Sequence, residues 1–329
     1  MQNVPINIGI IGVGHLGQHH VKHYKRLQDV NVVGIYDRDK GRGSEIANQY
    51  DTSVYNNVND LINNVEAVSI VTPTSSHGEI AELCIKKNKH VFIEKPITST
   101  LEEADHLLKL AKDKSIIMQI GHIERLNPAL LALKDYPIKP KFIEIQRLAP
   151  YTTRGTDVPV VLDKMIHDID ILLSLVKSNV TTIQATGLSI LTNSLDVAHA
   201  RIRFKNGTVA SIMSSRIAQV ESRKVKIFQK DLYTTIDMLE GLTEVYRIIS
   251  KNDRTPHTIK SANFSHDNIK KLISYEKPAI VKKDALYMEL KNFIQSIKGN
   301  ATPIVTGEEG RDALAVALKI QQMIIQDIN

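Results

Sequence analysis

Five short, continuously apolar runs between residues 6 and 120 constrain the fold of this chain more than any other feature. Amphipathic stretches with helical periodicity separate the runs. Strands that are apolar on both faces are buried on both faces, which is typical of a parallel sheet covered by helices on each side. The pattern therefore predicts a doubly wound α/β domain over residues 1–122. The runs are Ile6–Ile11, Val32–Tyr36, Ala67–Val71, His90–Ile93 and Ile116–Ile120.

The remainder of the chain, residues 123–329, has a different pattern, and 329 residues are enough for two domains with separate cores. A strand is expected over Lys141–Leu148, and several more follow a long helix. Asn206-Gly207 is a strong signal for a two-residue hairpin turn. Two helices, at about 284–298 and 307–325, end the chain. These features predict a C-terminal α+β domain with a mostly antiparallel sheet. We expect the functional site in a cleft between the two domains.

Composition and charge exclude several functional classes. The net charge of +6 is modest and dispersed, which argues against a nucleic-acid-binding surface. No apolar run approaches the roughly 20 residues that a bilayer span needs, and the N-terminal residues lack the pattern of a signal peptide. Cys84 is the single cysteine, so an internal disulfide is excluded. We expect a cytoplasmic protein that binds neither nucleic acid nor a membrane.

A glycine-rich loop directly follows the first apolar run and opens the first helix. Its sequence, Gly12-Val13-Gly14-His15-Leu16-Gly17, fits the pattern G-x-G-x-x-G. In this pattern one glycine makes a tight turn, one lets the backbone approach a pyrophosphate, and one packs the helix closely on the strand. Exposed amides and the helix dipole attract the phosphates. We therefore expect this loop, including His15 and Leu16, to bind a dinucleotide on a Rossmann-type domain; a purely structural glycine turn is the alternative.

The second apolar run ends in a carboxylate that bears on the choice of cofactor. Asp37 lies twenty residues after Gly17, where its side chain can accept hydrogen bonds from the adenosine ribose and repel a 2′-phosphate. NAD is therefore favoured. Arg38 could instead shield a 2′-phosphate or stack on adenine, so NADP stays open.

Three histidines at the start of the chain's first helix have a spacing that could suit a metal site, but other residues argue against one. His15, His19 and His23 follow one another at i, i+4 spacing, which can place imidazoles on one helical face. No cysteine or carboxylate joins them, and His15 belongs to the phosphate loop. We expect a polar helix face and no metal.

Two polar loops follow the third and fourth apolar runs, at the edge of the sheet where ligands of open α/β folds bind. They are Thr72-Pro73-Thr74-Ser75-Ser76-His77 and Glu94-Lys95-Pro96. Both should face the nicotinamide half of the cofactor. The candidate cofactor contacts are Thr72, Pro73, His77, Glu94 and Lys95, and Lys95 is also a candidate catalytic base. A solvated surface lysine held by Glu94 is the structural alternative.

A second group of polar residues lies in the expected long helix. Asp163, His167 and Asp170 occupy positions i, i+4 and i+7, which form one stripe of a regular helix. Their neighbours are mostly apolar, so the stripe is sheltered and needs partners. We expect Asp163 to orient His167, and His167 to reach a substrate hydroxyl. A helix-capping and salt-bridging set is the alternative.

Together these motifs resemble the Gfo/Idh/MocA oxidoreductases in their order and spacing, over essentially the whole chain. The resemblance is carried by Gly12-x-Gly14-x-x-Gly17, Glu94-Lys95-Pro96, Gly121-His122-Ile123-Glu124-Arg125-Leu126-Asn127-Pro128 and Asp163-x-x-x-His167-x-x-Asp170. It implies an NAD(P)-dependent sugar or polyol dehydrogenase with a Rossmann domain and a large open sheet, dimeric or tetrameric through that sheet. Lys95 would match the active-site lysine, His167 the catalytic histidine and Asp163 the carboxylate before it. The resemblance also implies a cis Lys95–Pro96 bond.

One subgroup is more similar still. Gly121–Pro128 and Arg154-Gly155-Thr156-Asp157-Val158 resemble segments of UDP-N-acetylglucosamine 3-dehydrogenases, which oxidise the sugar 3-hydroxyl. Arg125, Tyr151 and Arg154 would then lie around the substrate and meet its phosphates, although a structural salt bridge is the alternative for each arginine. An inositol or free-sugar dehydrogenase and a non-catalytic NAD-binding sensor are the competing functions. Either Lys95 or His167 would act as the base.

Overall fold

The computed structural model describes residues 4–152, 158–249, 259–260 and 272–328. Their contacts divide the chain into two units. The first comprises residues 1–123 together with 284–315, and the second comprises residues 124–283 together with 316–329.

The first unit contains the predicted parallel sheet, with the strand order β2-β1-β3-β4-β5. All four pairings are parallel, which confirms the doubly wound α/β prediction. Strand β3 is buried along its whole length, as its continuous apolar sequence requires. The strands are β1 (Ile6–Ile11), β2 (Val30–Tyr36), β3 (Ala67–Ile70), β4 (His90–Glu94) and β5 (Met118–Gly121).

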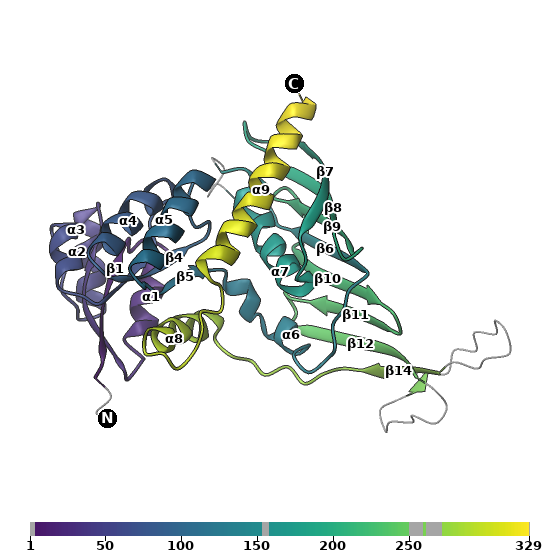
Figure 1. Ribbon diagram of the computed structural model, residues 1–329, viewed down its shortest axis with the longest axis horizontal. Coiled ribbons are helices and arrows are strands. Elements are labelled where there is room, and N and C mark those ends of the chain that lie inside the picture. The colour runs from purple at the N-terminus through teal and green to yellow at the C-terminus, as the bar shows by residue number, and fades with distance from the viewer. Residues whose placement is uncertain (1–3, 153–157, 250–258, 261–271, 329) are drawn as a thin grey trace. The chain divides into compact units, whose positions relative to one another are not determined.

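Helices cover both faces of this sheet. Helix α1 packs against α8 on one side, and α4 packs against α5 on the other (Figure 1). Helix α5 begins with a capping box, in which Thr100 and Glu103 satisfy each other's backbone N–H groups. The helices are α1 (Gly17–Tyr24), α2 (Lys40–Gln49), α3 (Val58–Asn63), the 3₁₀ turn η1 (Thr74–Ser76), α4 (His77–Lys86), α5 (Leu101–Asp113) and α8 (Ala285–Ile297). Cys84 is buried in α4.

Helix α8 belongs to the first unit, whereas the sequence pattern assigned all of residues 123–329 to one C-terminal domain. Its apolar face belongs to the core of the first unit. There Phe293 meets Phe92 of β4 edge to face, with ring centroids 5.8 Å apart. The following helix, α9 (Gly307–Ile328), begins in the first unit and ends in the second. An amphipathic sequence shows that a helix has an apolar face but does not say which sheet that face will cover.

The second unit is built on a nine-stranded sheet with the order β13-β14-β12-β11-β10-β6-β9-β8-β7. Every pairing is antiparallel except that of β6 with β9, which confirms the mostly antiparallel prediction. The Asn206-Gly207 turn joins β8 to β9 as predicted, and Gly207 has a φ of +84°. The strands are β6 (Phe142–Leu148), β7 (Val180–Leu188), β8 (Val197–Phe204), β9 (Val209–Ser215), β10 (Ser222–Gln229), β11 (Leu232–Asp237), β12 (Leu242–Ile249), β13 (Ile259–Lys260) and β14 (Leu272–Glu276).

An aromatic row crosses five adjacent strands of this sheet. Phe142, Phe228, Tyr233, Tyr246 and Tyr275 occupy directly opposed positions on β6, β10, β11, β12 and β14. Their ring centroids are 5.7, 4.7, 5.6 and 4.9 Å apart in that order. Opposed aromatic pairs stabilise a sheet, so this row ties the five strands together.

Short helices complete the second unit. They are the 3₁₀ turn η2 (Ile123–Leu126), which starts at the boundary, α6 (Pro128–Leu131), a π-helical turn over Val161–Met165 and α7 (Ile166–Val176). Asn127 caps α6 through the N–H of Ala129, as predicted from Asn127-Pro128. Among the helices that the structure describes, none is long and apolar enough to cross a membrane.

We expect Phe293→Ala to lower the free energy of unfolding by about 3–5 kcal/mol, because it removes a fully buried ring from the core of the first unit. Hydrogen exchange read by mass spectrometry should speed up in peptides from β1 and β4. The matched control is Ile212→Ala in β9, which should speed up exchange in the second unit instead. Faster exchange confined to the second sheet in Phe293→Ala would contradict the assignment of α8.

Candidate active site

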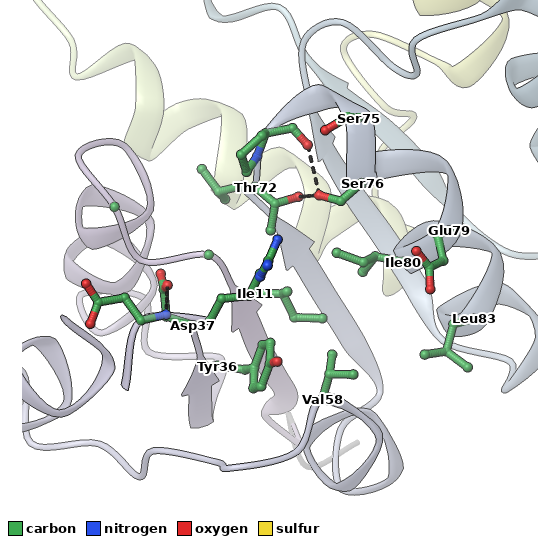
Figure 2. A pocket seen from close by; sticks show the side chains of 16 residues that line it. Ile11, Tyr36, Asp37, Val58, Thr72, Ser75, Ser76, Glu79, Ile80 and Leu83 are labelled. Carbon is green, nitrogen blue, oxygen red and sulfur yellow. Dashed lines mark hydrogen bonds between the residues drawn. The ribbon is translucent and has the colours of Figure 1, made fainter. Parts of the chain in front are cut away.

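A pocket of about 760 Å³ lies at the carboxyl ends of β1, β2 and β3 in the first unit (Figure 2). Strand β1 pairs with β2 on one side and β3 on the other, so the chain reverses its direction across the sheet there. Ligands of doubly wound folds bind at such a switch point, and the volume suits a cofactor. Predicted site residues that line the pocket are Gly12, Gly14, Asp37, Arg38, Thr72 and Pro73.

The three motif glycines have different surroundings. Gly12 has a φ of +86°, and a Cβ there would lie 2.6 Å from the Val71 carbonyl oxygen. At Gly17, a Cβ would lie 1.9 Å from the Gly12 carbonyl oxygen. At Gly14, by contrast, a Cβ would meet nothing within 4 Å. Gly12 and Gly17 therefore make the turn, whereas Gly14 leaves open space where a pyrophosphate can approach the backbone.

Asp37 fastens this loop to the end of β2. Its Oδ2 accepts the N–H of Val13 at 2.7 Å, and its Oδ1 accepts the N–H of Asp39 at 2.9 Å. Each carboxylate oxygen has further acceptor capacity for a ribose hydroxyl. Asp39 and Glu79 also line the pocket, and Arg38 is the one cationic side chain among its lining residues. Three carboxylates beside one guanidinium disfavour a 2′-phosphate, so the residues present fit NAD.

Apolar and hydroxyl side chains that were not chosen as individual cofactor contacts complete the pocket. Ser76 Oγ donates to Thr72 Oγ1 at 2.8 Å, which ties the start of α4 to the loop after β3 (Figure 2). The side chains that complete the pocket are Tyr36, Val58, Ser75, Ser76, Ile80 and Leu83. Ser75 and Ser76 belong to the polar loop that the sequence already placed at this edge of the sheet, and the end of the second apolar run could have indicated Tyr36.

Two predicted cofactor contacts, His77 and Glu94, do not line this pocket. The His77 imidazole is buried between backbone carbonyls of Thr72 and Pro96, and it does not line the pocket. Burial lowers the pKa of His77, although the hydrogen bonds to these carbonyls oppose that shift. The Glu94 carboxylate is buried too, and its Oε1 lies 3.1 Å from His20 Nε2. Lys95, which follows Glu94 in the chain, is half-buried. The Lys95–Pro96 bond is cis, as the family resemblance implied.

The predicted stripe of Asp163, His167 and Asp170 is not part of one regular α-helix. Asp163 lies in the π-helical turn, and His167 lies in the first turn of α7. The wider π turn changes the angular spacing of side chains, so the i, i+4 rule does not carry across it. Such turns often occur at functional sites. Asp163 and His167 are both half-buried, and Asp163 Oδ2 lies 3.3 Å from Lys164 Nζ.

Two buried arginine–carboxylate pairs fix α7 instead. Arg125 donates to Asp170 through Nε at 2.8 Å and Nη2 at 2.7 Å. Arg147 of β6 binds Asp168 in the same two-pronged way, at 2.9 and 2.8 Å, and also donates to Glu124 at 3.0 Å. Burial opposes the charge of Arg147, but the carboxylates of Asp168 and Glu124 outweigh it and raise the pKa of the guanidinium.

These pairs match the salt-bridge alternative for Asp170 and Arg125. The Asp170 carboxylate forms an ion pair with the guanidinium of Arg125, and both side chains are largely buried. Asp168 was missed, although it directly follows His167 and is itself buried. Tyr151 is 45% exposed, and Arg154 lies outside the described residues. Within the part of the chain that the structure describes, no cluster of three or more His, Cys, Asp or Glu side chains could hold a metal ion.

Comparison with known proteins assigns the family. Residues 6–122 match the model of an oxidoreductase family with an NAD-binding Rossmann fold, GFO_IDH_MocA, and residues 143–231 match the GFO/IDH/MocA C-terminal domain. The chain belongs to the Gfo/Idh/MocA oxidoreductase family. Membership confirms the resemblance drawn from the motifs, and it confirms NAD as the cofactor and an enzyme of the dehydrogenase class.

Relatives in this family match the chain over nearly its whole length. UDP-N-acetylglucosamine 3-dehydrogenase of Acidithiobacillus ferrooxidans is 33% identical over 319 residues, which cover 97% of both proteins. A solved structure of that enzyme, GnnA, superimposes with a TM-score of 0.87 over 98% of each chain, at 32% identity. Myo-inositol 2-dehydrogenase of Thermotoga maritima is 26% identical, over 94% of this chain and 93% of its own.

We expect Gly14→Ala to weaken NAD binding by roughly tenfold or more, or about 1.4 kcal/mol, without changing the thermal unfolding midpoint. The added methyl group meets no protein atom, but it occupies the space that a pyrophosphate needs. Titration followed by NADH fluorescence would measure the affinity.

The matched control is Gly17→Ala. Its Cβ would collide with the Gly12 carbonyl oxygen, so this variant should lower the unfolding midpoint as well as the affinity. Unchanged NAD affinity in Gly14→Ala would show that the cofactor phosphates do not approach this position.

Proposed function

We propose that this protein is an NAD-dependent dehydrogenase that oxidises a secondary hydroxyl of a sugar, specifically the 3-hydroxyl of a UDP-N-acetyl-sugar. The observation that carries this proposal is the full-length similarity to UDP-N-acetylglucosamine 3-dehydrogenase, at 33% identity and with a TM-score of 0.87 for the solved enzyme. The inositol dehydrogenase is less similar, at 26% identity over a comparable length. Dehydrogenation of a cyclic secondary alcohol is common to both relatives.

Three residues of this chain are proposed to carry the chemistry. Lys95 accepts the proton of the substrate hydroxyl as the carbonyl forms, and His167 binds and orients that hydroxyl. Asp163 acts through His167 by holding its ring in one tautomer. NAD, when bound, supplies the acceptor for the hydride that leaves the ring carbon. His167 as the base and Lys95 as the orienting group is the alternative division of these roles.

Support for Lys95 comes from its place in the fold. It directly follows β4, at the carboxyl edge of the sheet, where ligands of doubly wound folds bind. Lys95 is half-buried in this position. A surface lysine held by Glu94 is the structural alternative, and the Glu94 carboxylate is buried against His20.

The substrate phosphates are proposed to meet Tyr151 and Arg154, which precede the π turn in the sequence. Arg125 was a third candidate, but its charge is already balanced by Asp170. We therefore propose that Arg125 holds η2 against α7. The proposed division of labour gives cofactor binding to the first unit and substrate binding to the second.

Assembly into a homodimer or homotetramer through the nine-stranded sheet is also proposed. Several large apolar side chains on its strands are more than one-third exposed. They are Met213, Phe228, Leu242 and Ile248. A group of exposed apolar side chains on one sheet is typical of a surface that binds another protein chain. Light scattering would measure the mass of the assembly.

The test of the proposed substrate is a panel of UDP-sugars, inositols and free sugars, followed by the absorbance of NADH. Each assay is run with and without 2-oxoglutarate, which accepts hydride from NADH that stays bound. Because this returns the cofactor to NAD, the assays with 2-oxoglutarate are read by mass spectrometry of the oxidised sugar. We expect turnover with UDP-N-acetylglucosamine and none with myo-inositol. Turnover on inositol alone would replace the proposed substrate, and NAD binding without turnover on any member would favour a sensor.

Lys95→Met should lower kcat by roughly 10²- to 10⁴-fold, because it removes the base but keeps the length of the side chain. NAD affinity should stay near that of the wild type. Lys86→Met is the control, since that lysine is exposed on α4 and pairs with Glu82. Turnover close to normal in Lys95→Met would exclude Lys95 as the base.

A further inference from the structure

The segment Glu94-Lys95-Pro96 is flanked by two buried imidazoles that the chemistry proposed above does not use. His20 of α1 is 0% exposed and contacts Glu94, and His77 of α4 is 1% exposed and contacts Pro96. We refer to His20 and His77 as the histidine pair. Burying imidazoles costs free energy unless their nitrogens are hydrogen-bonded, so their partners indicate what they do.

His20 has a defined donor and acceptor arrangement. A carboxylate only accepts, so His20 Nε2 donates to Glu94 Oε1 at 3.1 Å. In the neutral imidazole Nδ1 is then the acceptor, and Ser69 Oγ donates to it at 2.9 Å. The ring also meets Phe92 edge to face, with centroids 5.4 Å apart. These contacts fix the imidazole in one tautomer and one orientation.

Glu94, whose carboxylate is held by His20, also contacts the backbone of Lys95. Its second oxygen, Oε2, accepts the backbone N–H of Lys95 at 3.3 Å. Gly121, opposite Glu94 on β5, makes room for the carboxylate, since a Cβ there would lie 2.8 Å from Glu94 Oε1. The chain Ser69, His20, Glu94 therefore ends on the backbone of Lys95.

His77 holds the other side of the segment and reaches further. Its Nδ1 lies 2.9 Å from the Pro96 carbonyl oxygen, and its Nε2 lies 2.9 Å from the Thr72 carbonyl oxygen. Thr72 lines the cofactor pocket. One buried ring thus contacts both the loop that carries Lys95 and the loop that lines the NAD site. In its neutral form the ring donates its N–H to one of the two carbonyl oxygens.

We propose that the histidine pair positions Lys95, with His20 acting through Glu94 on Lys95 alone and His77 linking Lys95 to the cofactor loop. This inference rests on the proposed function, because it takes Lys95 as a group that acts on the substrate. Neither imidazole is a catalytic residue, since each acts through another group. The two histidines differ in their expected effect on NAD affinity, because of the two only His77 contacts a loop of the NAD pocket.

The test compares His20→Leu and His77→Leu, which keep the sites apolar and filled. For His20→Leu we expect kcat to fall roughly 10- to 100-fold, the effect of a slightly misplaced catalytic group, with NAD affinity within about twofold of the wild type. For His77→Leu we expect a similar fall in kcat together with roughly three- to tenfold weaker NAD binding. His20→Gln should recover most of the kcat, because its amide can donate to Glu94.

Two other histidines provide matched controls. His23 lies on the same helix as His20 and is also buried, but it contacts Asp284 and Arg26. His90 lies at the opposite end of β4 and accepts the Ile117 N–H. His23→Leu and His90→Leu should leave kcat and NAD affinity within about twofold of the wild type.

A readout that does not depend on turnover separates this inference from the proposed function. Acetylation of Lys95 by dilute acetic anhydride, quantified by mass spectrometry against Lys86, should speed up roughly threefold or more in His20→Leu and His77→Leu, because the segment is loosened. Unchanged labelling and kcat in His20→Leu would overturn the inference, as would equal losses of NAD affinity in both variants or no recovery in His20→Gln. Wild-type protein that oxidises no sugar would sink the proposed function, and the labelling would still decide the role of the histidine pair.

Discussion

The parallel pairing of β1 with β2 on one side and β3 on the other determines where this protein can bind a cofactor. Because all three strands run in the same direction, the loops that follow them open at one edge of the sheet. The glycine loop follows β1, Asp37 follows β2 and Thr72 follows β3. The bond from the Val13 N–H to Asp37 then locks the first loop to the second. The strand order therefore determines the position of the pocket, and the side chains determine what the pocket can bind.

In the second unit, the helix that carries His167 is fixed by two ion pairs as well as by its buried apolar side chains. Removing one partner of such a buried pair typically costs about 3–5 kcal/mol, because the remaining charge is left without compensation. Arg147 and Arg125 come from β6 and η2, and they grip Asp168 and Asp170 on α7. His167 lies between the π turn and these two carboxylates in the sequence. Its orientation therefore depends on charged residues that need not touch a substrate.

The sequence predicted those features that depend on local periodicity or on a motif with a fixed backbone geometry. Continuous apolar runs identified the parallel sheet, G-x-G-x-x-G identified the cofactor loop, and Asn206-Gly207 identified a hairpin. Contacts between distant segments were not predicted. The packing of α8 on the first sheet, the bond of His20 to Glu94 and the pairing of Arg147 with Asp168 join residues that no local pattern relates. The π turn was missed because a helical stripe assumes a constant angular step.

The aromatic row of the nine-stranded sheet bears on how that sheet tolerates change. Side chains alternate between the two faces of a strand, so a slip of one residue would turn a ring to the opposite face. Four successive ring contacts would have to break for the strands from β6 to β14 to adopt another alignment. The hairpin loops that join β10 to β11 and β11 to β12 therefore do not have to specify the alignment themselves. Their lengths and sequences are free to vary while the strands keep their partners.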